Sequence, residues 1–247
     1  VQNLTEELST WIINIQTRFL RNLQFAKEIR SGLIAALTSK NEGLAMQCLT
    51  VLSNLEVKND LESNVLSSYL ISSNLEMGFT CQKPQFIKAG LGKILENLVL
   101  FNPGELALNL YFASYGSLYL GDIETGKIAL IHLLKIPKSD RPKFTWQVEL
   151  LRLIYSFETE EIYDDWPSLS RSVKRSISAS SLVYPSFVYG LIESLVNGAD
   201  INECIKMASE KSSIWKENVL EKRAHKFFDV HLWLESIAKG NPMGTLS

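Results

Sequence analysis

The residues from Gly121 to Lys127 are the closest match in this chain to a motif with known chemistry. They fit the first seven positions of the loop G-x-x-x-x-G-K-[ST], whose backbone amides and lysine bind nucleotide phosphates. The eighth position departs, because Ile128 replaces the hydroxyl residue that would hold magnesium. The preceding residues 118–120 continue a helical pattern where the loop requires a buried strand. We therefore interpret the segment as a turn between two helices, and we expect no cofactor.

The histidines and cysteines form no recognisable catalytic or metal site. His225 and His231 lie six residues apart, ~240° around a helix, so they cannot grip one metal ion together, and His132 is isolated. The three cysteines have no nearby histidine, and we interpret them as small buried apolar residues: Cys48, Cys81 and Cys204. An odd number of distant cysteines argues against a disulfide framework and favours a reducing, cytoplasmic compartment.

Two groups of charged residues flank and occupy one predicted helix. The acidic group could hold a metal ion, but its place at the start of the helix favours helix capping: Glu158, Glu160, Glu161, Asp164 and Asp165. The basic group lies on the far half of the same helix: Arg171, Lys174 and Arg175. Together with basic residues of the 135–143 loop it could form a modest anion-binding edge, and the alternative is a solvated helix face.

Three tyrosines, Tyr111, Tyr115 and Tyr119, are spaced by four residues and share one helix face. A tyrosine ring supplies contact area at a small entropic cost and its hydroxyl supplies direction, so such a face could hold a segment of a partner protein. The other interpretation is packing between helices inside the fold.

The elements that must position these side chains are predicted to be helices throughout. Apolar residues recur at steps of three and four, and no stretch alternates in the manner of a strand, so we predict an all-α fold. The first hundred residues predict one long helix over 3–30 and shorter ones at 44–55, 61–77 and 84–101. The rest predict three helix pairs and a last helix: 105–120 with 122–136, 143–158 with 161–177, 184–197 with 200–213, and 213–239.

A 39-residue period relates the three pairs, because Ile123, Ile162 and Ile201 each follow a short polar or acidic turn. One helix pair is too small to bury its apolar face alone, whereas three stacked pairs form a continuous core. We expect an N-terminal helical region over residues 1–101, and three pairs with a C-terminal capping helix over residues 102–247. Together they would make one continuous solenoid.

The first pair resembles a degenerate tetratricopeptide repeat. Gly121–Asp122 stands where that family places the turn between its two helices, and Ser114 and Gly126 stand where it needs small residues at the helix crossing. The chain departs from the family in its 39-residue period against the usual ~34, in Leu133 where alanine is expected, and in Pro137, one position early.

The second pair resembles uncharacterised tetratricopeptide-like proteins of Bacteroidetes. Residues 150–155 form a leucine-rich stretch that ends in Tyr155, and residues 169–175 carry the run Leu-x-Arg-Ser-x-x-Arg. Pro167 is a departure, and we expect it to move the helix start to about Trp166. The resemblance implies a right-handed α-α superhelix of helical hairpins and an intracellular repeat protein, and it implies no reaction.

In tetratricopeptide arrays the first helix of each pair lines a concave surface. The resemblance therefore places a set of side chains there, which we predict to bind a protein or peptide partner: Tyr111, Tyr115, Tyr119, Gln147, Tyr189 and Glu193. The absence of any catalytic set in the sequence favours a non-enzymatic scaffold for protein–protein interaction.

Composition sets bounds on this expectation. The chain has 247 residues, of which 46% are hydrophobic, and a formal charge of −2, so it lacks the bulk attraction that most nucleic-acid binders use. No apolar run reaches the ~18 to 20 residues of a membrane span. Because Val1 is not a methionine, we expect a mature or trimmed piece of a longer protein, which could also self-associate. The alternatives are a nucleic-acid-linked regulator that uses the basic edge, and an enzyme that uses the helical stack as a cavity.

Overall fold

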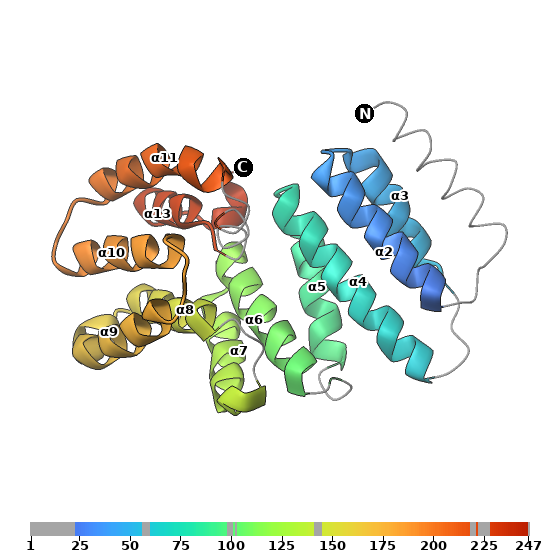
Figure 1. Ribbon diagram of the computed structural model, residues 1–247, viewed down its shortest axis with the longest axis horizontal. Coiled ribbons are helices and arrows are strands. Elements are labelled where there is room, and N and C mark those ends of the chain that lie inside the picture. Colours follow the sequence, from blue (N-terminus) through green and yellow to red (C-terminus); the bar gives the residue numbers. More distant parts are fainter. Residues whose placement is uncertain are drawn as a thin grey trace. The chain divides into compact units, whose positions relative to one another are not determined.

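The computed structural model describes residues 23–55, 60–97, 101, 103–140, 145–217, 221 and 228–246. Within these ranges the regular elements are eleven α-helices and two short 3-10 helices, with no strand (Figure 1). The all-α prediction is therefore confirmed. The chain divides into two compact units, Val1–Phe101 and Asn102–Ser247, which are described one at a time.

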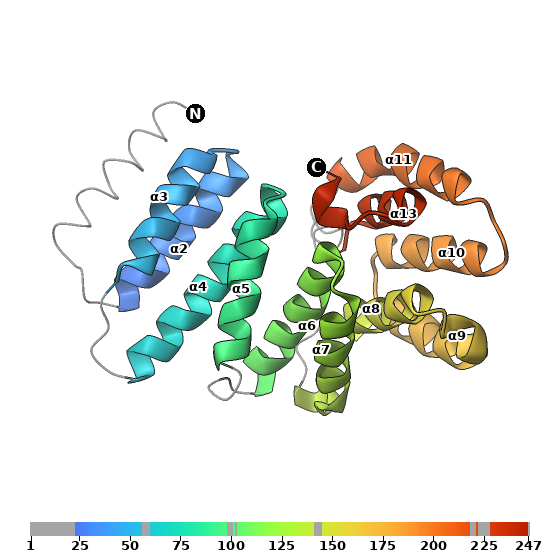
Figure 2. The same cartoon turned by 180° about the vertical axis from the view of Figure 1, so that it is seen from behind.

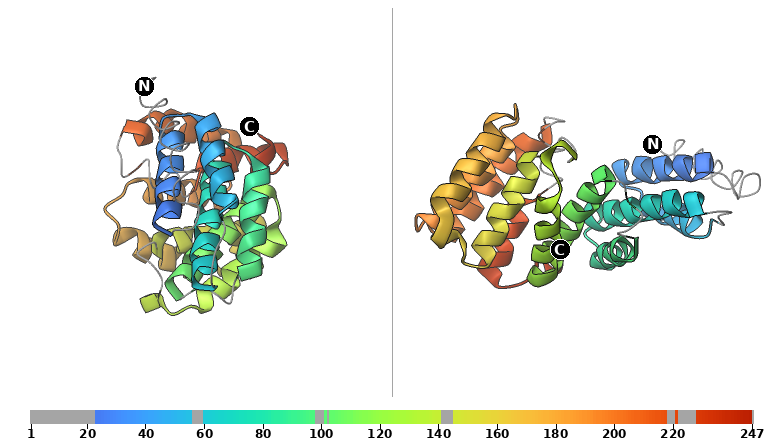
Figure 3. Two further views of the ribbon diagram at one scale, coloured as in Figure 1. Left: turned by 90° about the vertical axis from the view of Figure 1, so that its right-hand side faces the viewer. Right: turned by 90° about the horizontal axis from the view of Figure 1, so that it is seen from below.

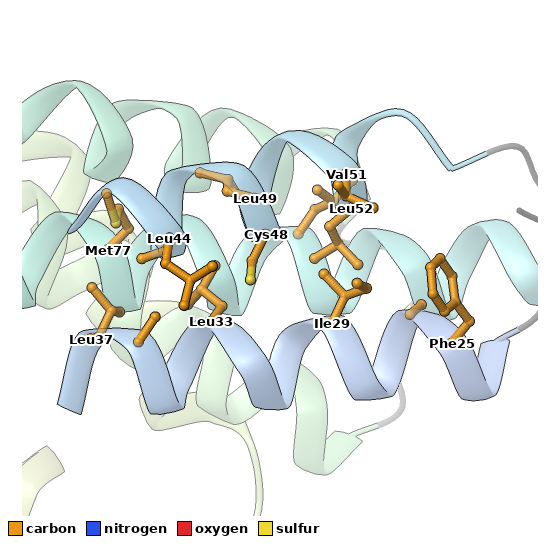
Figure 4. Close-up of a cluster of buried hydrophobic side chains, with 14 of the residues drawn as sticks. Phe25, Ile29, Leu33, Leu37, Leu44, Cys48, Leu49, Val51, Leu52 and Met77 are labelled. Carbon is orange, nitrogen blue, oxygen red and sulfur yellow. The ribbon is translucent and has the colours of Figure 1, made fainter. Parts of the chain in front are cut away.

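The first unit contains four described helices that run alongside one another (Figure 3). They are α2 (Leu23–Thr38), α3 (Glu42–Ser53), α4 (Asp60–Thr80) and α5 (Pro84–Asn97). Helix α2 packs on α3 and α4, and α4 packs on α5. Their shared core is apolar, with Ile29, Leu33 and Leu52 fully buried between α2 and α3 (Figure 4).

Two predicted boundaries in this unit are wrong. The helix predicted to end at about Arg30 continues as α2 through Leu33 and Leu37, whose side chains are buried in the core, and it ends at Thr38. Helix α4 continues past the predicted end at Met77, since Gly78 serves close packing: a Cβ at this position would lie 2.4 Å from the Ile87 side chain of α5. The predicted helix before residue 23 lies outside the described residues.

The second unit contains three successive helical hairpins and a C-terminal part. The elements are α6 (Pro103–Leu120), α7 (Ile123–Lys135), η2 (Lys138–Asp140), α8 (Thr145–Glu158), α9 (Ile162–Ser178), α10 (Tyr184–Val196), α11 (Ile201–Glu217), α13 (Val230–Lys239) and η3 (Met243–Thr245). Helices α6 with α7, α8 with α9, and α10 with α11 pack as neighbours in the sequence, and α8 also contacts α10. Packing of sequential hairpins, as the repeat predicted, is confirmed.

The segment that resembles a phosphate-binding loop is the turn between α6 and α7. Gly121 has a φ of 78°, a conformation that favours glycine, and Asp122 is the N-cap of α7. Its carboxylate accepts a hydrogen bond from the backbone N–H of Thr125 at 3.2 Å. The interpretation of this segment as a turn between two helices is confirmed.

Small residues in this hairpin admit a side chain from the next one. A Cβ on Gly126 would lie 1.7 Å from the Tyr155 hydroxyl of α8 and 3.0 Å from the Ser117 Cβ of α6. That hydroxyl donates a buried hydrogen bond to the carbonyl of Ser114 at 2.7 Å. The predicted close approach of α6 and α7 is present at Gly126, and Tyr155 uses it to join two hairpins.

Helix α9 consists of two helical pieces. Its first residue is Ile162, and Asp165 interrupts it with a φ of −130° and a ψ of 24°. Proline disfavours helical conformation in the residues before it, so Pro167 produces a kink, and the second piece begins at about Trp166, as predicted.

The single last helix predicted over residues 213–239 is also wrong. Helix α11 extends to Glu217, and a separate helix, α13, begins at Val230. Asp229 has extended backbone angles and accepts a hydrogen bond from the N–H of Leu232 at 3.1 Å. This N-cap begins a new helix, which the continuous apolar pattern concealed.

Candidate functional site

The C-terminal segment, defined as residues 228–246, packs on the last hairpin and also contacts the first helices of the hairpins. It contains α13, which packs against α11 (Figure 1), and η3, which packs against α6. The view from behind also shows α13 beside α11 (Figure 2). Its backbone and side chains contact residues of α6, α8 and α10, so it does more than cap the last hairpin.

Two buried tyrosine hydroxyls hold the backbone where the C-terminal segment begins. The Tyr184 hydroxyl of α10 donates to the carbonyl of Phe228 and accepts from the N–H of Val230 at 3.2 Å. The Tyr115 hydroxyl of α6 accepts from the N–H of Asp229 at 3.4 Å. These bonds satisfy polar backbone groups that would otherwise be buried without water.

Trp233 anchors the middle of the C-terminal segment. Its side chain is fully buried, with ring centroids 5.7 Å from Phe157 of α8 and 5.8 Å from Phe228. Its indole N–H donates to the Glu158 carboxylate at 2.6 Å. Burial raises the pKa of Glu158, and the indole hydrogen bond opposes part of that rise.

The end of the C-terminal segment packs on the last turn of α6. Met243 and Gly244 are buried, and a Cβ on Gly244 would lie 2.8 Å from the Tyr119 ring. A Cβ on Gly121 would lie 2.7 Å from the Pro242 side chain. The two glycines therefore permit close contact between α6 and the chain end.

Glu221 fixes the N-terminus of α10 and so positions Tyr184. Its carboxylate accepts from the N–H of Val183 at 2.7 Å and from the N–H of Tyr184 at 2.9 Å. The Tyr184 ring also packs edge-on against Trp215 of α11, with centroids 5.5 Å apart. A carboxylate and a second ring thus hold Tyr184 where its hydroxyl meets the C-terminal segment.

The three predicted binding tyrosines are buried in this arrangement. The exposed fractions of Tyr111, Tyr115 and Tyr119 are 1%, 3% and 2%. Burial raises the pKa of all three hydroxyls. Tyr115 and Tyr119 contact the C-terminal segment, so another protein would reach them only after that segment moved away.

The other predicted binding residues lie elsewhere in the unit. Gln147 is buried on α8, and Tyr189 faces α9, where its hydroxyl lies 2.8 Å from the Ser170 hydroxyl and donates to Glu193 at 2.8 Å. The α10 residue that faces the C-terminal segment is Tyr184, five positions earlier and ~140° away around the helix. Partner binding at the six predicted residues stays a prediction.

The predicted anion-binding residues are exposed, but the charge of one of them, Lys174, is partly neutralised by an ion pair. Lys174 pairs with Glu193 at 3.2 Å and lies 5.1 Å from the centroid of the Tyr189 ring. Its pKa is raised by hydrogen bonds to Tyr189 and Glu193. Arg171 donates to the carbonyl of Pro167 at 2.9 Å, and Arg175 is exposed. Anion binding, and the nucleic-acid-linked role built on it, stay predictions.

Two members of the predicted acidic group, Glu158 and Glu161, do not cap α9 as predicted. Glu161 occupies the N-cap position but makes no side-chain cap hydrogen bond, and it pairs instead with Lys127 of α7 at 2.5 Å. Glu158 belongs to α8 and accepts from Trp233. Asp164 and Asp165 lie in the first turn of α9, where the helix dipole favours negative charge.

Among the described residues, the cysteines and the possible metal-binding side chains do not form a recognisable site. Cys48 and Cys204 are buried, and burial raises the pKa of the Cys48 thiol to about 11, so it is not an activated thiolate. Within the part of the chain that the structure describes, no three His, Cys, Asp or Glu side chains gather as a metal site would require. His225 lies outside that part. No helix among the described residues is both long and apolar enough to cross a membrane.

Comparison of the chain with protein-family models, with curated proteins and with solved structures gives no match.

Proposed function

We propose that the chain is a non-enzymatic interaction module whose hairpins form a tetratricopeptide-like, right-handed superhelix. Its binding face is the surface that α6, α8 and α10 present to the C-terminal segment, and it holds a segment of another protein. These three helices are the first helices of successive hairpins. The observation that supports this proposal most is that the C-terminal segment of this chain contacts all three helices. It forms hydrogen bonds with Tyr115, Glu158 and Tyr184.

The chemistry of the face favours a peptide over a small molecule. Its contacts are mainly aromatic rings, from Tyr115, Tyr119 and Phe157, which suit an apolar helix surface. Its polar groups bond to backbone N–H and C=O groups and to an indole N–H. Main-chain hydrogen bonds of this kind provide affinity in peptide recognition, and side-chain pockets provide specificity.

Selection from a displayed random-peptide library tests this proposal. The bait is the full chain with Trp233→Ala, which weakens the C-terminal segment without replacing any residue of α6, α8 or α10. We expect enriched peptides whose capture is lost when Tyr115→Phe and Tyr184→Phe are added, because both hydroxyls that bond to the backbone are then absent. Circular dichroism would check that each bait remains helical.

Tyr163→Phe supplies the matched control, since Tyr163 is 60% exposed on α9 and its hydroxyl should not affect capture. The proposal fails if no peptide is enriched, or if the double variant captures the peptides as well as its parent.

A further inference from the structure

The C-terminal segment carries its own signals for a short helix. Asp229 caps the N-terminus of α13, and Gly240, with a φ of 64°, ends it in the left-handed conformation. A helix of only 10 residues is marginal in water by itself, so α13 depends for its stability on its packing against α11 and on its contacts with the face. This is the behaviour of a peptide that folds when it binds.

Two kinds of contact hold the C-terminal segment on the face. Some could be made by the main chain of any peptide, and others require a particular side chain. Tyr115 and Tyr184 bond to main-chain atoms, which every peptide offers, and so they set the register of the bound segment. The face recognises Trp233 by its side chain, because only an indole combines a large ring with an N–H group that can donate to Glu158. Specificity is therefore concentrated at one position, four residues after the N-cap.

We propose that the C-terminal segment occupies the binding face as an internal ligand, and that the partner is a peptide of another protein with the same pattern. The pattern is an apolar residue, an acidic N-cap in extended backbone directly after it, and a tryptophan four residues after the cap. This inference rests on the proposed function and adds to it the chemistry of the partner. Binding of that partner requires release of residues 228–246.

Competition between the two ligands makes the inference measurable. When a face is open only part of the time, the apparent dissociation constant is the intrinsic one divided by the open fraction. Weakening the internal ligand should therefore strengthen binding of an added peptide. Asp229 and Trp233 suit this purpose, because both belong to the C-terminal segment and not to α6, α8 or α10.

The test is fluorescence anisotropy with a labelled synthetic peptide of residues 228–246, titrated with the full chain. Loss of an N-cap corresponds to about a fivefold change in an equilibrium constant, so Asp229→Ala should bind the peptide about fivefold more tightly than the natural chain. Trp233→Ala should bind it more tightly still. Lys239→Ala should match the natural chain, since Lys239 is exposed and its ion pair with Glu235, at 3.5 Å, lies at the surface.

A second peptide, with alanine in place of the tryptophan, should bind none of these chains. If Trp233→Ala proves unstable, the milder Asp229→Ala carries the same test. The inference is overturned if all chains bind the peptide equally, or if the peptide without tryptophan binds as well. It is also overturned if light scattering shows that the variants form dimers by exchanging this segment, which would identify a second copy as the occupant.

The library selection distinguishes failure of this inference from failure of the proposed function. Enrichment of library peptides that lack tryptophan would leave the proposed function standing and reject this inference, whereas no enrichment at all would reject both.

Discussion

The two units close their cores in different ways. In the first unit the buried cluster is built from apolar residues of α2, α3 and α4, which follow one another in the chain (Figure 4). In the second unit the hairpins are covered by a segment far away in sequence, and the hydrogen bond from Asp229 to Tyr115 spans 114 residues. That closure uses polar groups, Glu158 and Tyr184 among them, as well as rings.

From this difference we infer which part of the molecule can be displaced by a partner. Apolar contacts between sequence neighbours cost little loop entropy and form with the helices themselves. A distant terminal segment forms its contacts separately, and its buried polar partners favour one register because each must be satisfied. We therefore expect this terminal segment to leave while the hairpins stay folded.

The largest expected effect comes from Trp233→Ala. It removes a fully buried ring and leaves Glu158 without its indole donor, so we expect the free energy of unfolding of the second unit to fall by about 3–5 kcal/mol. Hydrogen exchange measured by mass spectrometry should show faster exchange over α13. The comparison variant is Leu33→Ala in the first unit, expected to cost about 2–5 kcal/mol. Faster exchange over α13 in Leu33→Ala would refute the distinction between the two units.

A smaller loss is expected for Gly126→Ala. The added methyl would overlap the Tyr155 hydroxyl, which lies 1.7 Å from the Cβ position, and overpacking typically costs about 1–3 kcal/mol. Gly190→Ala in α10 is the matched control, because nothing lies within 4 Å of its Cβ position. Alanine should stabilise that helix by about 0.5–1 kcal/mol. Urea unfolding measures both, and equal effects would show that Gly126 is not a close contact.

The pH dependence of stability should change in Glu158→Gln. Burial raises the pKa of Glu158 above 4.5 in the folded protein, so the folded state binds this proton more tightly than the unfolded state. The free energy of unfolding therefore falls as pH rises from 4.5 through the folded pKa. Glutamine keeps an oxygen for the indole and abolishes that fall. The stability of the variant relative to the natural chain should be greater at about pH 7 than at about pH 4 in urea unfolding.

Glu161→Gln should show the opposite sign. Lys127 lowers the pKa of Glu161 by a hydrogen bond, so this carboxylate stabilises the fold above its unfolded pKa and loses that contribution as pH falls. The exposed pair is screened by solvent, so the change should be slight. If the pH dependence of stability changed with the same sign in both variants, the assignment of Glu158 as the buried carboxylate of the two would be contradicted.

The smallest effect is expected for Lys83→Ala in the first unit. Lys83 pairs with Glu42, but the side chains are 36% and 51% exposed, and exposed ion pairs contribute little to stability. The urea midpoint should not change measurably. A clear decrease would show that the first unit, too, depends on polar contacts.

Much of the second unit could be predicted because its signals are local. Helical spacing of apolar residues identified the hairpins, and Gly121 and Asp122 marked the turn between α6 and α7. The need for small residues at Ser114 and Gly126 was also visible, although the side chain that uses the space, Tyr155, was not. Local periodicity shows that a helix has an apolar face, without showing what covers it.

The sequence by itself determined that this chain is helical and that its helices form hairpins in order, because capping, turn conformation and a 3.6-residue period act between near neighbours. Only the tertiary structure decided that Tyr115 and Tyr119 lie under the C-terminal segment, and that Tyr184 instead of Tyr189 faces it. It also decided that Glu158 serves an indole instead of a helix end. These outcomes depend on contacts between residues far apart in the chain, which no local pattern specifies.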